Sequence, residues 1–298
     1  MIEQTIYYSI ADLQLEITTT KESDVSLVLQ NFEPFRVEFD SGKTISCRVY
    51  MSQVDLEFDY VNSKLLSDIS IVWGDRFTFY ETDEYYWTLI QYSNDKSKHW
   101  KMRSSKDFSF NTIYCGNFDN SKRNFISWYC MVAFAQSGIK HNCVLFHASV
   151  VMDSAAGYAF LGKSGTGKST HSRLWLSNIE GITLLNDDNP AVRVVDEQVF
   201  IYGTPWSGKT KCYVNDVRPL KGLVRLRQAP ENIFEIRKNK DALLTLLPSC
   251  SAIRWNLNLY SSLVNILLEI LTRVPIAELK CLPDAAAAHL CHIELKNL

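Results

Sequence analysis

The chain has 298 residues, of which 46% are hydrophobic and 21% are charged, and its formal net charge is −2 with an isoelectric point near 6.3. This composition is normal for a globular protein, and the length suggests two domains. The slightly negative charge gives no electrostatic basis for binding nucleic acid. The sequence has no run of 18 apolar residues and begins without the charged and apolar regions of a signal peptide, so we expect neither a membrane span nor a secretory leader.

Residues 1–118 are predicted to form a β-rich N-terminal domain of unknown role. Aromatic and β-branched residues alternate with polar ones in several segments, a pattern typical of strands with one buried face. The alternating segments are residues 35–39, 54–58, 76–80 and 85–92. Turn-forming residues at 40–43 separate the first two segments. A domain boundary is expected near residues 117–120.

The eight cysteines are widely and irregularly spaced and include no C-x-x-C pair. This spacing disfavours both a zinc site and a small disulfide scaffold. Cys130 and Cys143 have apolar neighbours and are expected to be buried thiols. The cysteines therefore favour a reducing, cytoplasmic location.

Residues 119–298 are predicted to form an α/β domain, because short apolar strands alternate with helical segments. Strands are expected at 143–151, 156–161, 182–185, 191–195, 198–202, 222–226 and 233–236. Helices are expected at 122–136, 168–176, 241–247 and 257–271, with a last one from Asp284.

A glycine-rich motif, G-x-x-x-x-G-K-[ST], separates the strand at 156–161 from the helix that follows it. Its glycines allow the backbone to approach a phosphate group, whose charge meets free N–H groups and the positive end of the helix dipole. Lys168 is expected to reach the β- and γ-phosphates of a nucleotide, and Ser169 to ligate Mg²⁺. The alternative is a glycine-rich turn that caps an ordinary helix.

The predicted cofactor-binding residues are this motif, the residue after it, and a lysine in a second glycine-rich loop at residues 203–209. They are Gly162, Lys163, Ser164, Gly165, Thr166, Gly167, Lys168, Ser169, Thr170 and Lys209. The alternative for the second loop is a simple turn at the end of a hairpin.

Two adjacent carboxylates, Asp187 and Asp188, follow the apolar strand at 182–185. One carboxylate can hold a metal ion beside a nucleotide, and the other can take a proton from an attacking hydroxyl. The alternative is turn chemistry, since Asp-Asp-Asn-Pro is also a good turn sequence. Taken alone, His147 is weaker evidence for a catalytic site, because a single histidine in an apolar strand is usually a core residue.

Three segments in this order resemble the catalytic domain of HPr kinase/phosphorylase, a bacterial serine kinase whose nucleotide domain is related to phosphoenolpyruvate carboxykinase. The segments are residues 146–151, 162–169 and 184–188. The family has a histidine-bearing strand about fifteen residues before its phosphate loop, and His147 stands fifteen before Gly162. It also has a strand that ends in Ala-Asp-Asp, where this chain has Asn186 before the two aspartates.

The resemblance implies a P-loop nucleotide-binding domain of the HPr kinase/carboxykinase type that uses ATP and Mg²⁺. It makes Asp187 the general base on the acceptor hydroxyl, with His147 and Lys168 as the other catalytic residues. It makes Ser169 and Asp188 the metal ligands. Which aspartate is the base stays open, because adjacent carboxylates titrate as a coupled pair.

The predicted function is ATP/Mg²⁺-dependent transfer of the γ-phosphate to a hydroxyl, such as the serine of a peptide, a protein or a small molecule. The alternatives are a catalytically weak nucleotide-binding regulatory or scaffold protein, and a carboxykinase-like enzyme. The expected partners are a nucleotide and an unknown acceptor, with no nucleic acid or membrane. Homo-oligomers are suggested by the hexamers that the family forms.

Overall fold

The computed structural model describes residues 3–20, 22–54, 56–68, 77–91, 99–115, 123–208 and 210–298. By its contacts the chain divides into unit 1, Met1–His141 with Ile253–Tyr260, and unit 2, Asn142–Ala252 with Ser261–Leu298. The boundary expected near residues 117–120 lies outside the described residues. The division by contacts falls later along the chain, because helix α2 (Arg123–Ser137) packs against strands β4, β8 and β9 of unit 1.

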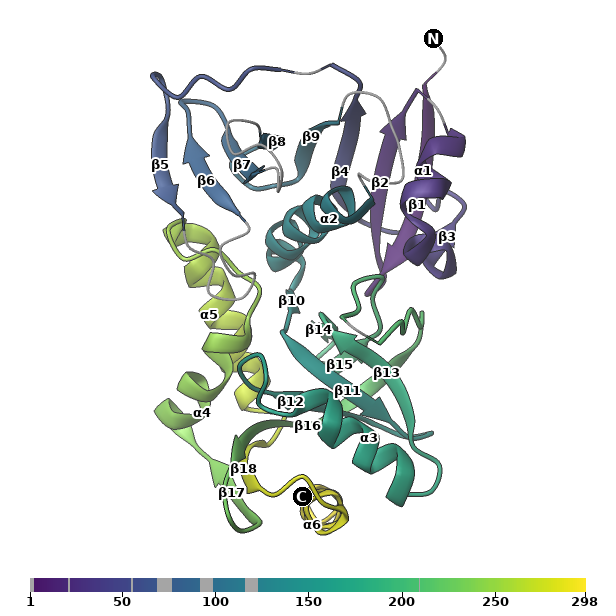
Figure 1. Cartoon of the computed structure of the whole chain (residues 1–298), viewed down its shortest axis with the longest axis vertical. Coiled ribbons are helices and arrows are strands. Elements are labelled where there is room, and N and C mark those ends of the chain that lie inside the picture. The colour runs from purple at the N-terminus through teal and green to yellow at the C-terminus, as the bar shows by residue number, and fades with distance from the viewer. Residues whose placement is uncertain are drawn as a thin grey trace. The chain divides into compact units, whose positions relative to one another are not determined.

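Unit 1 contains a nine-stranded sheet in the order β3-β1-β2-β4-β9-β8-β7-β6-β5 (Figure 1). Its strands are β1 Gln4–Ile10, β2 Leu13–Thr19, β3 Arg36–Val37, β4 Ile45–Ser52, β5 Lys64–Ser67, β6 Thr78–Glu81, β7 Tyr86–Gln91, β8 His99–Ser104 and β9 Phe110–Tyr114. Its other helices are α1 Glu22–Val28 and the 3₁₀ helices η1 Gln30–Phe35 and η3 Gly138–His141. Ala11 and Asp12 join β1 to β2 with φ of 52° and 58°, the left-handed turn that matches the twist of a hairpin.

Two strands predicted in unit 1 are corrected by the structure. The segment at 35–39 keeps only the short β3, because Phe35 ends η1, which contains Pro34. The described residues of the segment at 54–58 form no strand. There the ring of Phe58 packs against Tyr60 and against Tyr80 and Trp87 of β6 and β7, so it covers the sheet without joining it as a strand. The strands expected at 76–80 and 85–92 are confirmed as β6 and β7, although Arg76 and Tyr92 lie outside the described residues.

Unit 2 contains a second nine-stranded sheet, with the path β10-β14-β15-β16-β12-β11-β13 and with β18 pairing both β16 and β17. Its strands are β10 Cys143–Leu145, β11 Ala148–Met152, β12 Gly157–Leu161, β13 Thr183–Asp188, β14 Ala191–Val195, β15 Gln198–Tyr202, β16 Val217–Gln228, β17 Ile233–Arg237 and β18 Ile276–Cys281. Its helices are α3 Lys168–Asn178, α4 Asn239–Leu246, the 3₁₀ helix η4 Leu247–Ser249, α6 Ala285–Lys296 and the later part of α5 Leu257–Leu271. Strands β12, β16 and β18 are parallel, and every residue of β11 and β12 is buried.

Most elements predicted for unit 2 are confirmed, with two informative differences. The strand expected at 143–151 is interrupted at Phe146 and His147, whose N–H groups donate to Pro190 O and Ser249 O. The strand expected at 182–185 continues as β13 to Asp188, so both aspartates belong to the sheet. No helix among the described residues is long and apolar enough to span a bilayer.

All eight cysteines are free, and seven of them are buried, including Cys130 and Cys143 as predicted. Burial raises the pKa of Cys143 to about 12, with Arg193 opposing the shift. Buried thiols of this kind are inert.

Helices α3 and α6 pack together over the core of unit 2. The fully buried indole of Trp175 on α3 contacts the rings of Tyr158 and Phe160 on β12 and of His292 on α6. This cluster fixes α3, and therefore the loop before it, against the sheet.

Asp153, which follows β11, ties α6 to the sheet. Its carboxylate accepts from Lys296 Nζ at 2.8 Å and from the N–H groups of Ala155 and Ala156 at 2.8 and 2.7 Å. Burial by itself raises the pKa of Asp153, but Lys296 and the two N–H groups outweigh it and hold the pKa at about 2. Ionised Asp153 therefore stabilises the folded state above its unfolded pKa of 3.8, and this stabilisation is lost as the pH falls toward 2.

We therefore expect Asp153→Asn to lower the free energy of unfolding at pH 7 by about 1 to 2 kcal/mol, and to reduce its fall between pH 4.5 and 3. Urea denaturation at pH 7, 4.5 and 3 measures both effects. Glu294→Gln, at an exposed position of α6, is the control and should match the wild type. Equal pH dependence in all three proteins would contradict the role given to Asp153.

Candidate active site

The glycine-rich loop connects the end of β12 to the start of α3. Gly162, Gly165 and Gly167 have φ of 156°, 82° and 102°, a region that residues with a side chain rarely adopt. Within the loop, Thr166 donates to Lys163 O through both its N–H (3.2 Å) and its hydroxyl (2.8 Å). The sequence motif thus forms a tight, internally bonded turn directly before a helix N-terminus, a place where anions bind in proteins.

Lys168, His147 and Asp188 form a continuous chain of contacts. Lys168 Nζ lies 2.9 Å from Gly162 O and 2.9 Å from His147 Nε2, and His147 Nδ1 lies 3.0 Å from Asp188 Oδ1. Because the ammonium has only protons to give, Nε2 accepts and Nδ1 carries the proton that is donated to Asp188. The break between β10 and β11 makes this possible, since it places His147 outside the ladder.

Neighbouring groups shift the pKa of Lys168 in opposite directions. Burial lowers the pKa of Lys168, Asp188 and Asp187 oppose that shift, and Arg225 adds to it. A phosphate group would add negative charge beside the ammonium and favour its protonated form.

Ser169 and Asp187 form the second pair of the site. Ser169 Oγ donates to Asp187 Oδ1 at 2.8 Å, and Asp187 is buried whereas Asp188 is half-buried. The described residues include no group of three or more His, Cys, Asp or Glu side chains that could hold a metal ion. The hydroxyl and two carboxylates present are hard oxygen donors that fit Mg²⁺, which usually completes its shell with phosphate oxygens and water.

The second glycine-rich loop lies against β13. Gly208 N–H donates to Asp187 O at 2.7 Å, and Ser207 forms an isolated bridge with Asp188. Trp206 is buried, which anchors this loop. Lys209, one of the predicted cofactor-binding residues, lies outside the described residues.

Asn186 is a site residue that the sequence reasoning missed. It is fully buried, and its Oδ1 accepts from the N–H groups of Asp188 and Asn189, both at 3.1 Å. Its Nδ2 lies 3.2 Å from both the carbonyl and the hydroxyl oxygens of Thr204. Asn186 therefore holds the backbone that carries both aspartates. The signal available was an asparagine before a turn, which often bonds N–H groups two residues on.

We expect Asn186→Ala to lower the free energy of unfolding by about 2 kcal/mol, because buried N–H groups and the Thr204 carbonyl lose their partner. Urea denaturation gives the value. Asn178→Ala, at an exposed position of α3, should change the same quantity by less than about 0.5 kcal/mol. Unchanged stability in Asn186→Ala would show that the network is unimportant.

A cavity of about 390 Å³ opens beside the glycine-rich loop. Its polar lining includes Gly165, Thr166, Gly167, Thr170 and Gln228, and its apolar lining includes Leu174, Leu226, Leu282 and Pro283. This volume and this mixture are typical of small-molecule sites. Four predicted binding residues thus line the cavity, namely Gly165, Thr166, Gly167 and Thr170. Outside it, Lys168 contacts His147, and Ser169 bonds to Asp187 on β13.

Fold and site together describe a mixed α/β protein with two large sheets, in which a glycine-rich loop before a helix faces a pair of strand-end carboxylates. No protein-family model matches the sequence, and no curated protein matches it. Among solved structures, the HPr(Ser) kinase/phosphatase from Coxiella burnetii is similar to 51% of this chain and to 88% of its own, at 14% identity and a TM-score of 0.31. So distant a likeness carries no functional argument, and only the side chains of the site bear on the function.

Proposed function

We propose that this protein is an ATP/Mg²⁺-dependent phosphotransferase that moves the γ-phosphate to a hydroxyl of a peptide, a protein or a small molecule. The observation that carries the proposal is the convergence of Lys168, Ser169, His147 and both aspartates at the opening of the glycine-rich loop. Each side chain has the chemistry that phosphoryl transfer needs: a cation, a hydroxyl, an imidazole and two carboxylates. On this proposal unit 2 is a P-loop domain of the HPr kinase/carboxykinase type, working in the cytoplasm.

Lys168 is held where its ammonium could exchange its present acceptors for the oxygens of a bound phosphate. Its ammonium has two acceptors at 2.9 Å, one of which is only the neutral Nε2 of His147. A charged phosphate oxygen is a stronger acceptor than imidazole. Binding of a nucleotide would therefore draw Lys168 toward the phosphates and away from His147 Nε2, while His147 Nδ1 keeps its contact with Asp188.

The contacts favour one division of roles between the aspartates. Asp187 accepts a hydrogen bond from the hydroxyl of Ser169, so these two oxygen donors are suited to hold the metal ion together. Asp188 is more exposed and is oriented by His147, so this pair suits the side of the acceptor. The proposal thus reverses the division that the family resemblance implied.

In the proposed reaction, the oxygen of the acceptor hydroxyl bonds to the γ-phosphorus while the proton of that hydroxyl passes to Asp188. The bond between the γ-phosphorus and the β–γ bridging oxygen breaks, and ADP leaves. His147 keeps Asp188 oriented, and Lys168 offsets the charge on the phosphate oxygens. Mg²⁺, held by Ser169 and Asp187, would supply further charge neutralisation.

The cavity beside the loop would hold the nucleoside. It adjoins Gly165 and Gly167, and its apolar residues offer the flat contact that a base needs. Gln228 Nε2 lies 3.5 Å from Gly165 O and would also face the nucleoside.

Cys281 allows this placement to be tested, because it lines the same cavity and is the one cysteine that is not buried. Burial nevertheless raises the pKa of Cys281, and Asp284 adds to the shift, so labelling with a maleimide is best done near pH 9. ATP with Mg²⁺ should slow labelling at least about five-fold, from the occupancy expected at saturation. Mass spectrometry identifies the labelled peptide, and equal rates with and without ATP would contradict the placement.

The function itself is tested with γ-labelled ATP, Mg²⁺ and a panel of serine peptides, proteins and small hydroxyl compounds. We expect label on at least one acceptor at a rate above hydrolysis. Nucleotide binding with release of label to water alone would favour the regulatory or scaffold role instead. Absence of any nucleotide binding would refute both.

A further inference from the structure

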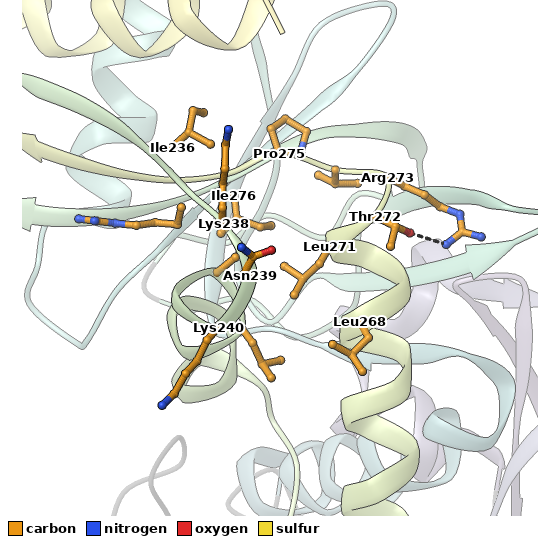
Figure 2. Close-up of a pocket in the computed structure, with 14 residues that line it drawn as sticks. Ile236, Lys238, Asn239, Lys240, Leu268, Leu271, Thr272, Arg273, Pro275 and Ile276 are labelled. Carbon is orange, nitrogen blue, oxygen red and sulfur yellow. Dashed lines mark hydrogen bonds between the residues drawn. The ribbon is translucent and has the colours of Figure 1, made fainter.

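Unit 2 contains another cavity, of about 640 Å³, which shares no lining residue with the site above. It lies between the β17–α4 connection and the end of α5 with the start of β18 (Figure 2). Its volume is within the range of small-molecule sites. The proposed phosphotransferase reaction makes no use of it.

One wall of this cavity is apolar. Leu268 and Leu271 project from α5 toward α4, and Pro275 and Ile276 close the upper side in Figure 2. Leu268 is 47% exposed, so part of this wall is in contact with water. An apolar ligand group would remove this surface from water.

Basic side chains also line the cavity. Four basic residues, Arg237, Lys238, Lys240 and Arg273, line the cavity, and no acidic residue does. The guanidinium groups are engaged, because Arg237 pairs with Glu235 and Glu278, and Arg273 donates to the carbonyl groups of Glu197 and Glu269. The two lysines differ in the direction of their side chains.

Lys238 has no ion pair or hydrogen bond from its ammonium within the described ranges. In Figure 2 its side chain runs past Ile276 toward Pro275, along the cavity, whereas Lys240 points away from α5. Asn239, between them, has a φ of 52°, and its amide group lies beside Leu271. Lys238 and Asn239 therefore bring an unpaired cation and an amide to the edge of an apolar wall. Asp241, in the first turn of α4, does not line the cavity.

We propose that this cavity binds a small amphiphilic anion, a carboxylate or phosphate monoester attached to an apolar chain or ring. The apolar part would cover Leu268 and Leu271, where each buried methylene adds to the affinity. The anionic group would meet the ammonium of Lys238 and the amide of Asn239, with charge-assisted hydrogen bonds. This proposal does not depend on the phosphotransferase activity.

The test uses the full chain and titration calorimetry with octanoate and octyl phosphate. Octanol supplies the apolar chain without the charge, and acetate supplies the charge without the chain. We expect saturable binding of at least one octyl anion, at least about ten-fold tighter than octanol or acetate. Preference between the two octyl anions identifies the head group.

Three variants locate the site. Lys238→Met keeps the apolar stem and should weaken binding about ten-fold, the effect of one charge-assisted hydrogen bond. Leu268→Asn, at an exposed position, should weaken it several-fold. Lys211→Met, the matched control, removes an exposed lysine that lines neither cavity and should bind like the wild type. If neither octyl anion shows saturable binding, the proposal is overturned. Binding of an acidic peptide that contains leucine would not rescue it. Equal losses in both lysine variants would also overturn it.

Discussion

Asp188→Asn should slow phosphoryl transfer by about 10² to 10⁴-fold, the usual contribution of a general base. The amide has nearly the same shape as the carboxylate but cannot accept the acceptor's proton at neutral pH. Its contact with His147 Nδ1, 3.0 Å long in the wild type, can persist through the amide oxygen. The affinity for ATP, measured by calorimetry, should therefore change by less than about two-fold, while transfer of labelled γ-phosphate shows the loss.

Asp187→Asn is the matched partner of this variant, because the residue is adjacent on the same strand. We expect it to raise the Mg²⁺ concentration needed for half-maximal transfer, since the carboxylate bonded to Ser169 would lose its charge. Excess Mg²⁺ should restore much of its activity and none of that lost in Asp188→Asn. If excess Mg²⁺ instead rescues only Asp188→Asn, the two roles are exchanged. If both variants transfer at nearly the wild-type rate, the proposed enzyme mechanism is wrong.

Lys168→Met should weaken ATP binding by about 30- to 150-fold, because a hydrogen bond to a charged group contributes about 2 to 3 kcal/mol. Methionine keeps the length of the side chain but removes the ammonium that would meet the phosphates. It also removes the contacts of Lys168 Nζ to His147 and to Gly162 O, and the loop should still fold because Thr166 keeps its two bonds to Lys163 O. Calorimetry with ATP and with ADP measures the effect.

The control for this variant is Lys240→Met, which removes a lysine of the same unit outside the proposed active site. It should bind ATP like the wild type. The expected loss should be larger for ATP than for ADP, since the γ-phosphate adds a charge beside the ammonium. Unchanged affinity in Lys168→Met would mean that the glycine-rich loop does not hold a triphosphate.

The elements around the glycine-rich loop could be predicted because their signals are local. Three glycines in the motif, a short apolar strand before them and a helical segment with Leu174 and Trp175 after them are each visible within a short window of sequence. The carboxylates Asp187 and Asp188 were found for the same reason. The contact of Asp188 with His147 depends on the register of β11 with β13, and that of Asp187 with Ser169 depends on the packing of α3 against β13. No local pattern contains either.

Other features depend on contacts between distant segments and could not be predicted. The strand at 143–151 is broken because Phe146 and His147 bond to Pro190 and Ser249, which are far along the chain. The role of Asn186 depends on Thr204, and both cavities are formed by elements from separate parts of the chain. In unit 1 the alternation at 54–58 predicts a strand, yet Phe58 joins an aromatic cluster. A period-two pattern records that one side of a segment is buried and does not identify what covers it.

The hydrogen bond from Ser169 to Asp187 has a consequence for the resting protein. It joins the two proposed metal-binding groups directly and gives the buried carboxylate of Asp187 a hydrogen-bond partner. If the proposed function holds, this hydrogen bond would keep the two groups together after ADP and Mg²⁺ depart, and each cycle would start from the same geometry.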